Sequence, residues 1–137
     1  MRAFIDTSAW FAAANSRDAH NIDAKRVFAK IASPVTTDHV LVETWGLLNT
    51  RVNFAAAEQF WSNIRRGVAD LEKVTSSDLE AAWAIGRAYE DQSFSIVDRT
   101  SFVVMERLAI RRVVSFDQDF LIYRYGRQRD QAFEVVR

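Results

Sequence analysis

The chain has 137 residues, of which 49% are hydrophobic and 12% aromatic, and its 18 Lys and Arg balance 18 Asp and Glu. We expect residues 1–137 to form one domain with a well-filled core, because this length suits a single compact unit and the composition excludes a disordered chain. The absence of cysteine excludes disulfides, thiolate metal sites and cysteine nucleophiles. No apolar run approaches the roughly 18 residues that cross a bilayer, and Asp6 interrupts the first one, so we expect a cytoplasmic protein without signal peptide or membrane partner.

Short apolar segments alternate with amphipathic helical patterns along the chain. The first apolar segment, residues 3–5, ends at Asp6-Thr7-Ser8, which is typical of a helix start. Gly67 stands where the clearest helical pattern, residues 54–66, is expected to end. The predicted strands cover residues 3–5, 34–36, 71–74, 112–115 and 132–136, and the predicted helices cover residues 8–14, 20–32, 38–50, 54–66, a segment beginning at 76–78, 96–109 and 117–123.

Helical spacing also predicts which large side chains are buried. In the segment that begins at residues 76–78, Leu79, Ala82, Trp83 and Gly86 share one helical face. Trp61 lies on the apolar stripe of the 54–66 helix. We therefore expect the four tryptophans in the core, and they are Trp10, Trp45, Trp61 and Trp83.

The alternation of strands and helices predicts an α/β fold with a parallel sheet covered on both faces. Ligands of such sheets bind beyond the carboxyl ends of the strands, where the strand order reverses. If the second and third strands lie on one side of the first strand and the fourth lies on the other, the crevice falls between the first and fourth strands. Asp6 follows the first of these strands and Asp117 follows the fourth.

Two further acids stand in mainly apolar surroundings. Asp98 is at the start of the 96–109 helix, and Glu43 interrupts the apolar stretch Val40-Leu41-Val42. Each acid also has an ordinary interpretation as a helix cap, a first-turn acid or a solvated side chain. Asp119, two residues after Asp117, is a fifth candidate with the same alternative.

A cluster of these carboxylates requires protons or a cation. Two like charges about 5 Å apart repel by roughly 1–3 kcal/mol at effective dielectric constants between 80 and 20. Oxygen ligands without Cys and with only two His favour a hard ion, Mg²⁺ or Mn²⁺, over zinc. Such an ion activates water and stabilises the charge at a phosphodiester, so no general-base histidine is needed.

Four blocks of the sequence then match a known family in order. They are Phe4-Ile5-Asp6-Thr7-Ser8-Ala9-Trp10 followed by His20 and Ala24, Thr36-Thr37-Asp38-His39-Val40-Leu41-Val42-Glu43-Thr44, Asp91 with Ser95-Ile96-Val97-Asp98, and Val114-Ser115-Phe116-Asp117-Gln118-Asp119-Phe120. With these blocks the chain resembles a PIN domain, and specifically the VapC-type ribonuclease toxins of toxin–antitoxin pairs.

This resemblance implies a PIN-like three-layer α/β fold, with a central parallel sheet of about five strands flanked by helices. It implies a divalent-metal-dependent endoribonuclease that acts as the toxin of a type II toxin–antitoxin pair. Asp6, Glu43, Asp98 and Asp117 match the catalytic acids, and Asp119 joins them as a candidate ligand of Mg²⁺ or Mn²⁺. Thr7 and Ser8 match the polar pair expected to orient a water.

The implied partners are an RNA substrate, a small cognate antitoxin and a second copy of the chain in a homodimer. We expect hydrolysis to leave 5′-phosphate and 3′-hydroxyl ends. The RNA target, the antitoxin, the dimer interface, the number of ions and the choice between Asp117 and Asp119 stay open at this stage.

Charge is distributed unevenly along the chain. Residues 1–98 carry 10 basic and 13 acidic side chains, whereas residues 99–137 carry 8 and 5, and 15 of the 18 cations are Arg. Because Arg binds phosphate through a planar fork, this last part is expected to guide the RNA backbone, although ordinary surface charge explains it equally well. The candidate arginines are Arg99, Arg111, Arg112, Arg124, Arg127 and Arg129.

Other classes of protein are alternatives to the nuclease. A metal-independent ribonuclease would use His20 and His39 as acid and base. A haloacid-dehalogenase-like phosphatase needs an Asp at the position of Ser8, and a phosphorelay receiver needs a late Lys, whereas the last lysine is Lys73. A PIN-like module that binds RNA or a partner without catalysis is the remaining alternative.

Overall fold

The computed structural model describes all residues 1–137 and contains a five-stranded, fully parallel sheet with the strand order β3-β2-β1-β4-β7. The predicted placement of the first four strands is therefore confirmed, and so is the expected PIN-like α/β architecture. Its strands are β1 (Arg2–Ile5), β2 (Ser33–Thr37), β3 (Asp70–Glu72), β4 (Arg112–Val114) and β7 (Glu134–Val136).

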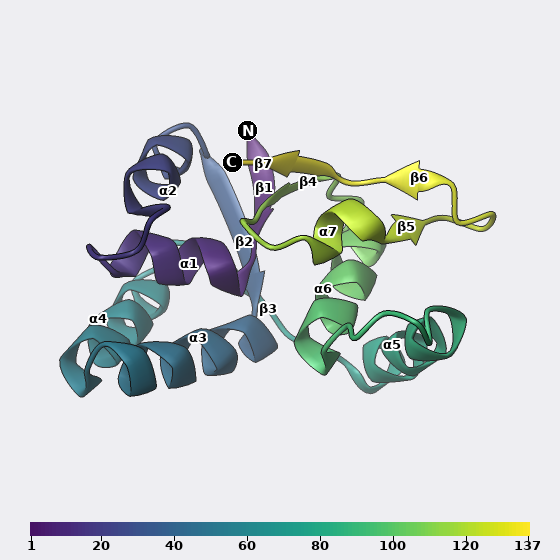
Figure 1. Cartoon of the computed structure of the whole chain (residues 1–137), viewed down its shortest axis with the longest axis horizontal. Coiled ribbons are helices and arrows are strands. Elements are labelled where there is room, and N and C mark those ends of the chain that lie inside the picture. Colours follow the sequence, from purple (N-terminus) through teal and green to yellow (C-terminus); the bar gives the residue numbers. More distant parts are fainter.

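Helices cover both sides of this sheet. Figure 1 shows α1 to α4 on one side of the strands and α5 to α7 on the other, and the two chain ends lie close together beside β1 and β7. The helices are α1 (Thr7–Ala14), α2 (Asn21–Phe28), α3 (Asp38–Arg51), α4 (Phe54–Arg65), α5 (Ser76–Ala88), α6 (Ile96–Arg107) and α7 (Asp119–Ile122).

Local capping rules account for several helix ends. The Thr37 hydroxyl accepts a hydrogen bond from the Val40 amide at the start of α3, and Asn53 caps α4 in the same way. Gly67 has a φ of 90° and its amide donates to Ile64, so it ends α4 in the left-handed conformation that glycine tolerates. The predicted role of Gly67 is thus confirmed.

The core lies where β1 and β4 meet the helices. Phe4, Ile5, Val113 and Val114 are completely buried in the central strands. On the α6 side, Phe102 stacks on Tyr123 at 4.2 Å with an interplanar angle of 4°, within a cluster of aromatic rings. This packing holds the carboxyl ends of β1 and β4, which carry the candidate site.

The predicted bounds of the last strand, residues 132–136, are wrong. Gln131–Ala132 forms β6, which pairs antiparallel with β5 (Arg124–Tyr125), and only Glu134–Val136 joins the main sheet as β7. Phe133 between them is buried against the aromatic cluster, and Tyr125 stacks on it at 4.7 Å. Burial of this ring separates the two short strands. The predicted 20–32 helix is also shorter, since α2 ends at Phe28.

The predicted burial of two tryptophans is wrong. Trp10 is buried, but Trp61 is 46% exposed and Trp83 is 66% exposed. In α5 the buried face contains Asp78, Ala82 and Ile85, so the helix is rotated relative to the predicted face and Leu79 is exposed as well. Because alanines lie on both sides of α5, helical spacing alone does not show which face is buried. The ion pair between Asp78 and Arg107 favours burial of the face that carries Asp78.

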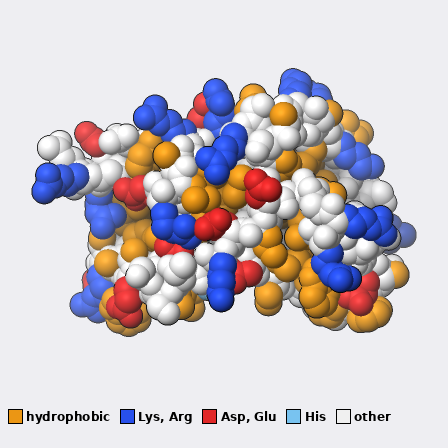
Figure 2. All heavy atoms as spheres, turned by 180° about the vertical axis from the view of Figure 1, so that it is seen from behind, with side chains coloured by type: hydrophobic (Ala, Val, Ile, Leu, Met, Phe, Trp, Pro, Cys, Tyr) orange, Lys and Arg blue, Asp and Glu red, His pale blue; other side chains and the backbone are white.

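Charged side chains of both signs cover the surface. Figure 2 shows basic and acidic side chains interspersed over one face, with apolar side chains between them. The charge difference between the two parts of the sequence therefore does not gather into one basic patch on that face. No helix has the length and apolar character that crossing a membrane requires.

Candidate active site

Asp6 lies directly after β1 and is only 2% exposed. It holds the N-cap position of α1, but its side chain does not cap that helix. Instead, the Ser8 and Ser115 hydroxyls donate hydrogen bonds to its Oδ2 at 3.0 and 2.9 Å. The two serines orient the Asp6 carboxylate at the carboxyl end of β1. The alternative interpretation of Asp6 as a helix cap is therefore wrong for its side chain.

Asp117 reaches the same edge through the end of β4. The Ser115 hydroxyl, which donates to Asp6, also accepts the Asp117 amide at 3.0 Å. The Ser8 hydroxyl accepts the Phe116 amide at 2.9 Å. Polar contacts between α1 and the loop after β4 thus bring Asp6 and Asp117 together at the predicted crevice.

Asp98 enters from the start of α6. It takes part in a capping box in which Ser95 accepts the Asp98 amide at 3.0 Å and Asp98 accepts the Ser95 amide at 3.2 Å. The side chain is 8% exposed. Asp98 therefore does cap α6, and the same hydrogen bonds orient its carboxylate toward the end of β4.

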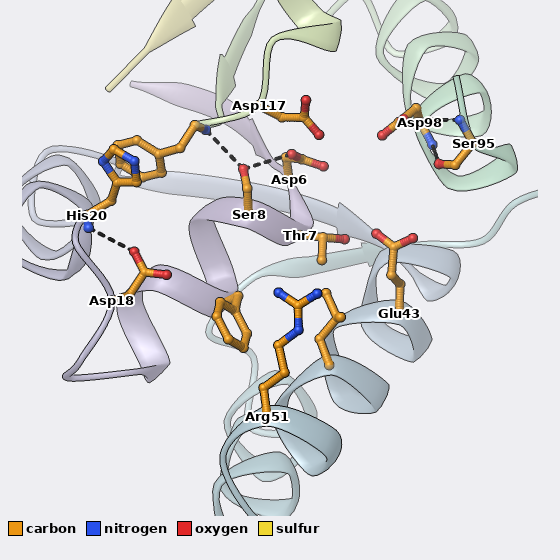
Figure 3. A pocket seen from close by; sticks show the side chains of 13 residues that line it. Asp6, Thr7, Ser8, Asp18, His20, Glu43, Arg51, Ser95, Asp98 and Asp117 are labelled. Carbon is orange, nitrogen blue, oxygen red and sulfur yellow. Dashed lines mark hydrogen bonds between the residues drawn. The ribbon is translucent and has the colours of Figure 1, made fainter. Parts of the chain in front are cut away.

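Glu43 comes from the second turn of α3 and is half-buried rather than solvated. Burial raises its pKa, the nearby charges of Asp98 and Asp117 add to this effect, and the Thr7 hydroxyl opposes it. Thr7 is buried and its Oγ1 has no hydrogen-bond partner at close range. Figure 3 shows that hydroxyl directed toward Glu43.

Four of the five predicted acids meet in one pocket of about 410 Å³, in the size range of ligand sites, and Asp119 lies beside it. Asp6, Glu43, Asp98 and Asp117 all line it, although they come from four separate segments (Figure 3). Carboxylate oxygens of Asp98, Asp117 and Asp119 lie within 4.8 Å of one another. Both residues of the Asp117/Asp119 pair therefore belong to the acidic cluster.

The cluster holds negative charge without a neutralising side chain. The ion pairs of the protein involve other acids, and no Lys or Arg lies within 4.0 Å of a cluster carboxylate. Burial raises the pKa of Asp6 to about 6, against hydrogen bonds from the two serines, and the Asp98 charge adds to the shift. Burial, contact with Asp98 and the neighbouring negative charges raise the pKa of Asp119 to about 7.

This donor set fits a hard divalent cation. All of its ligand atoms are carboxylate oxygens, which Mg²⁺ and Mn²⁺ prefer. A cation at Asp98, Asp117 and Asp119 would offset the burial and the negative charges that raise the pKa of Asp119. The residues present therefore fit the divalent metal that the resemblance implies.

The six arginines expected to guide RNA lie outside the pocket. Arg112 pairs with Glu134 at 3.1 Å, and Arg124 donates to backbone carbonyls at the end of α7, the shortest bond being 2.8 Å to Leu121. These two serve local structure. Of the other four, Arg99 donates to the Ser95 carbonyl at 3.4 Å, and the Arg129 Cζ lies 5.6 Å from the centroid of the Tyr89 ring. The remaining two are Arg111 and Arg127.

Three features of the pocket escaped sequence reasoning. Ser115 is a buried polar residue after the apolar pair Val113-Val114, and that break in the strand was the available signal. Arg51 is the one Lys or Arg that lines the pocket, and its spacing of eight residues from Glu43 on α3 was the signal for it. His20, a candidate acid or base in the sequence, also lines the pocket, and its stacking on Phe116 at 4.5 Å is the contact that had no sequence signal.

The histidine pair of the metal-independent alternative is not brought together in this pocket. His20 lines it, but His39 does not, and the His39 Nδ1 contacts the Thr100 hydroxyl at 3.2 Å. The geometry therefore offers no acid–base pair of histidines here.

The sequence and structure are similar to known proteins. The PIN domain family matches residues 3–126. The chain is 40% identical over 118 residues, 85% of this chain and 90% of the relative, to the 23S rRNA-specific endonuclease VapC20 of Mycobacterium tuberculosis. The chain therefore belongs to the PIN-domain family. Its predicted similarity to VapC-type ribonuclease toxins within that family is confirmed.

Solved structures agree with this assignment. The crystal structure of Mycobacterium tuberculosis VapC20, described as a sarcin-ricin loop cleaving toxin, superimposes with a TM-score of 0.83 at 39% identity, covering 87% of this chain and 92% of that one. VapBC2 from Rickettsia felis gives a TM-score of 0.69 at 12% identity, covering 100% of both chains. FitAcB from Neisseria gonorrhoeae gives 0.68 at 11%, covering 100% of this chain and 97% of that chain. The last two support the fold alone.

Proposed function

We propose that this endoribonuclease toxin depends on Mg²⁺ or Mn²⁺ and cuts 23S ribosomal RNA at the sarcin-ricin loop. The observation that carries the metal dependence is the meeting of Asp98, Asp117 and Asp119 within 4.8 Å without a neighbouring basic side chain. The target is supported by the 40% identity to VapC20, whose name and structure describe that specificity.

Asp98, Asp117 and Asp119 would hold one or two divalent ions, with Asp6 and Glu43 completing the set directly or through water. A bound ion of this kind lowers the pKa of water and neutralises charge on the phosphate in an in-line displacement. Ser8 and Ser115 keep the Asp6 carboxylate oriented through their hydrogen bonds. We therefore assign Ser8 to positioning Asp6 rather than to orienting water.

Glu43 and Thr7 act on the attacking water in this proposal. The Thr7 hydroxyl is buried and directed toward Glu43 without a hydrogen bond of ordinary length, so the two groups together can hold a water. Because burial raises the pKa of Glu43, its carboxylate takes up a proton more readily than an ordinary Glu and suits a general base. Attack at phosphorus with departure of the 3′ oxygen leaves 5′-phosphate and 3′-hydroxyl ends.

The arginines of residues 99–137 act at longer range. Since none of the six lines the pocket, and Arg112 and Arg124 serve local structure, we assign the other four to attraction of the RNA backbone rather than to contact at the cleaved bond. A small antitoxin inhibits the enzyme, and we propose a homodimer in the cytoplasm as the free form. Size-exclusion chromatography with light scattering distinguishes the dimer from a monomer.

Mapped cleavage of 23S rRNA tests the proposal. Purified protein with Mn²⁺ is expected to cut the sarcin-ricin loop, EDTA is expected to stop cleavage, and Asp98→Asn is expected to abolish it. Cleavage that persists in EDTA would contradict metal dependence, whereas cutting confined to another RNA would contradict the target alone. A folded wild-type protein that binds RNA without cutting it would identify a binding module.

A further inference from the structure

Arg51 places a positive charge at one end of the acidic pocket. It lies in the last turn of α3, eight residues after Glu43 on the same helix, and both side chains line the pocket. At the rise of an α-helix, eight residues separate them by about 12 Å along the axis. Figure 3 shows the Arg51 guanidinium directed from α3 into the pocket, toward Thr7.

The guanidinium of Arg51 has no partner within the protein. It forms none of the ion pairs of the structure, although acids line the same pocket. Its Cζ lies 6.0 Å from the centroid of the Phe11 ring, at the outer limit of a cation–π contact. This contact leaves the hydrogen-bond donors of the guanidinium available.

Helix stabilisation explains only part of this arrangement. A cation in the last turn of α3 interacts favourably with the helix dipole. That effect requires the charge to be near the helix end, but it does not require a side chain that extends into the pocket. A planar fork of donors in a pocket that handles a phosphodiester matches the recognition of phosphate oxygens.

We propose that Arg51 binds an RNA phosphate other than the one being cut. The inference rests on the proposed function and names how the strand is held in that site. The acids act on the cleaved phosphodiester, and Arg51, which lines the same pocket from a later turn of α3, contacts another phosphate of the same strand. Contacts at two phosphates hold a single-stranded segment in the pocket, as suits a loop whose nucleotides are splayed.

RNA binding in a cleavage-deficient background tests this role. Fluorescence anisotropy with a sarcin-ricin loop oligonucleotide compares Asp98→Asn with Asp98→Asn/Arg51→Ala over a series of salt concentrations. Loss of a charged contact is expected to weaken binding roughly ten- to a hundredfold and to reduce the salt slope by about one phosphate contact. Arg51→Lys is expected to restore the slope and only part of the affinity, because it keeps the charge without the fork.

Controls separate this inference from the metal site and from the fold. Arg66→Ala removes an exposed Arg outside the pocket and is expected to leave binding unchanged. In the otherwise wild-type protein, Arg51→Ala is expected to raise KM while preserving stabilisation by Mn²⁺. Unchanged affinity and salt slope, or loss of the Mn²⁺ effect, would overturn the role of Arg51 while metal-dependent cleavage by the wild type stands. Absence of cleavage by the wild type would overturn the proposed function and this inference together.

Discussion

The starts of α5 and α6 carry the same local motif with opposite consequences. Asp78 exchanges hydrogen bonds with Thr75 at 3.0 and 3.1 Å, as Asp98 does with Ser95 at 3.2 and 3.0 Å. Both aspartates are buried, with 3% and 8% of their surface exposed. The local sequence therefore sets the cap in each case but leaves the role of the carboxylate undecided.

The difference lies in what faces each carboxylate. Arg107 donates to both oxygens of Asp78 at 3.0 and 2.9 Å, and its hydrogen bonds, with those of Thr75, outweigh the effect of burial and lower the pKa of Asp78. Asp98 instead faces Asp117 and Asp119 without a cation. A compensated acid stabilises the fold, whereas an uncompensated one is available for a metal ion.

The largest expected effect follows from removing the charge of Asp98. Asp98→Asn should lower the rate of RNA cleavage roughly 10²–10⁴-fold, because it removes a carboxylate from the reacting site. Its melting temperature without metal should stay equal or rise, since repulsion with Asp117 and Asp119 is relieved. Initial rates and thermal melts check both points, and Asp78→Asn is the matched control with near-normal activity per folded molecule. Equal losses in the two variants would remove the distinction between the sites.

Metal binding should distinguish the same two aspartates. Mn²⁺ at about 100 times its dissociation constant should stabilise the wild type by about 2.7 kcal/mol, because the folded state alone holds the site. Thermal melts with and without EDTA measure this effect. Asp78→Asn should retain it and Asp98→Asn should lose most of it. Stabilisation that survives in Asp98→Asn would place the ion elsewhere.

Loss of the compensated pair should reduce stability without reducing chemistry. Asp78→Asn is expected to lower the free energy of unfolding by about 1–3 kcal/mol, since hydrogen bonds from a charged partner are lost and Arg107 keeps only Glu72 as an ionic partner. Urea denaturation measures the change. A variant as stable as the wild type would show that the Asp78–Arg107 pair contributes nothing net.

The pH dependence of stability should be opposite in sign to that of ordinary paired acids. With metal removed, the raised pKa values of Asp6, about 6, and Asp119, about 7, mean that the folded state binds protons more tightly than the unfolded state. The free energy of unfolding should therefore fall as pH rises from about 5 to about 7 and then level off. Asp78 adds nothing in this window, because its lowered pKa leaves it ionised in both states there.

Thermal melts in EDTA between pH 5 and pH 8 measure this dependence. Asp119→Asn should flatten the profile, because it removes the acid with the larger shift. Stability that rises with pH through this window would contradict the uncompensated cluster.

The sequence predicted the site best where strand order alone brings functional residues together. The carboxyl ends of β1 and β4 must meet in the predicted strand order, so Asp6 and Asp117 could be placed together before any coordinates. Ser115 could not be assigned, because its hydrogen bond to Asp6 joins residues 109 positions apart. Arg51 was missed because a last-turn Arg has an adequate local explanation.

The sequence-based predictions were wrong where helical or strand spacing allows more than one arrangement. α5 offered two faces of similar apolar character, and the ion pair between Asp78 and Arg107 selected the one that exposes Trp83. Because the partners are 29 residues apart, helical periodicity cannot detect that pair. The β5–β6 hairpin likewise depends on burial of Phe133 in a tertiary aromatic cluster.

We propose that acids from separate segments form one divalent-metal site. Anomalous diffraction at the manganese edge, from crystals grown with Mn²⁺, locates the ion. We expect a peak at coordination distance from the carboxylates of Asp98, Asp117 and Asp119. A fully occupied manganese site elsewhere in the molecule, with no peak among these three residues, would contradict it.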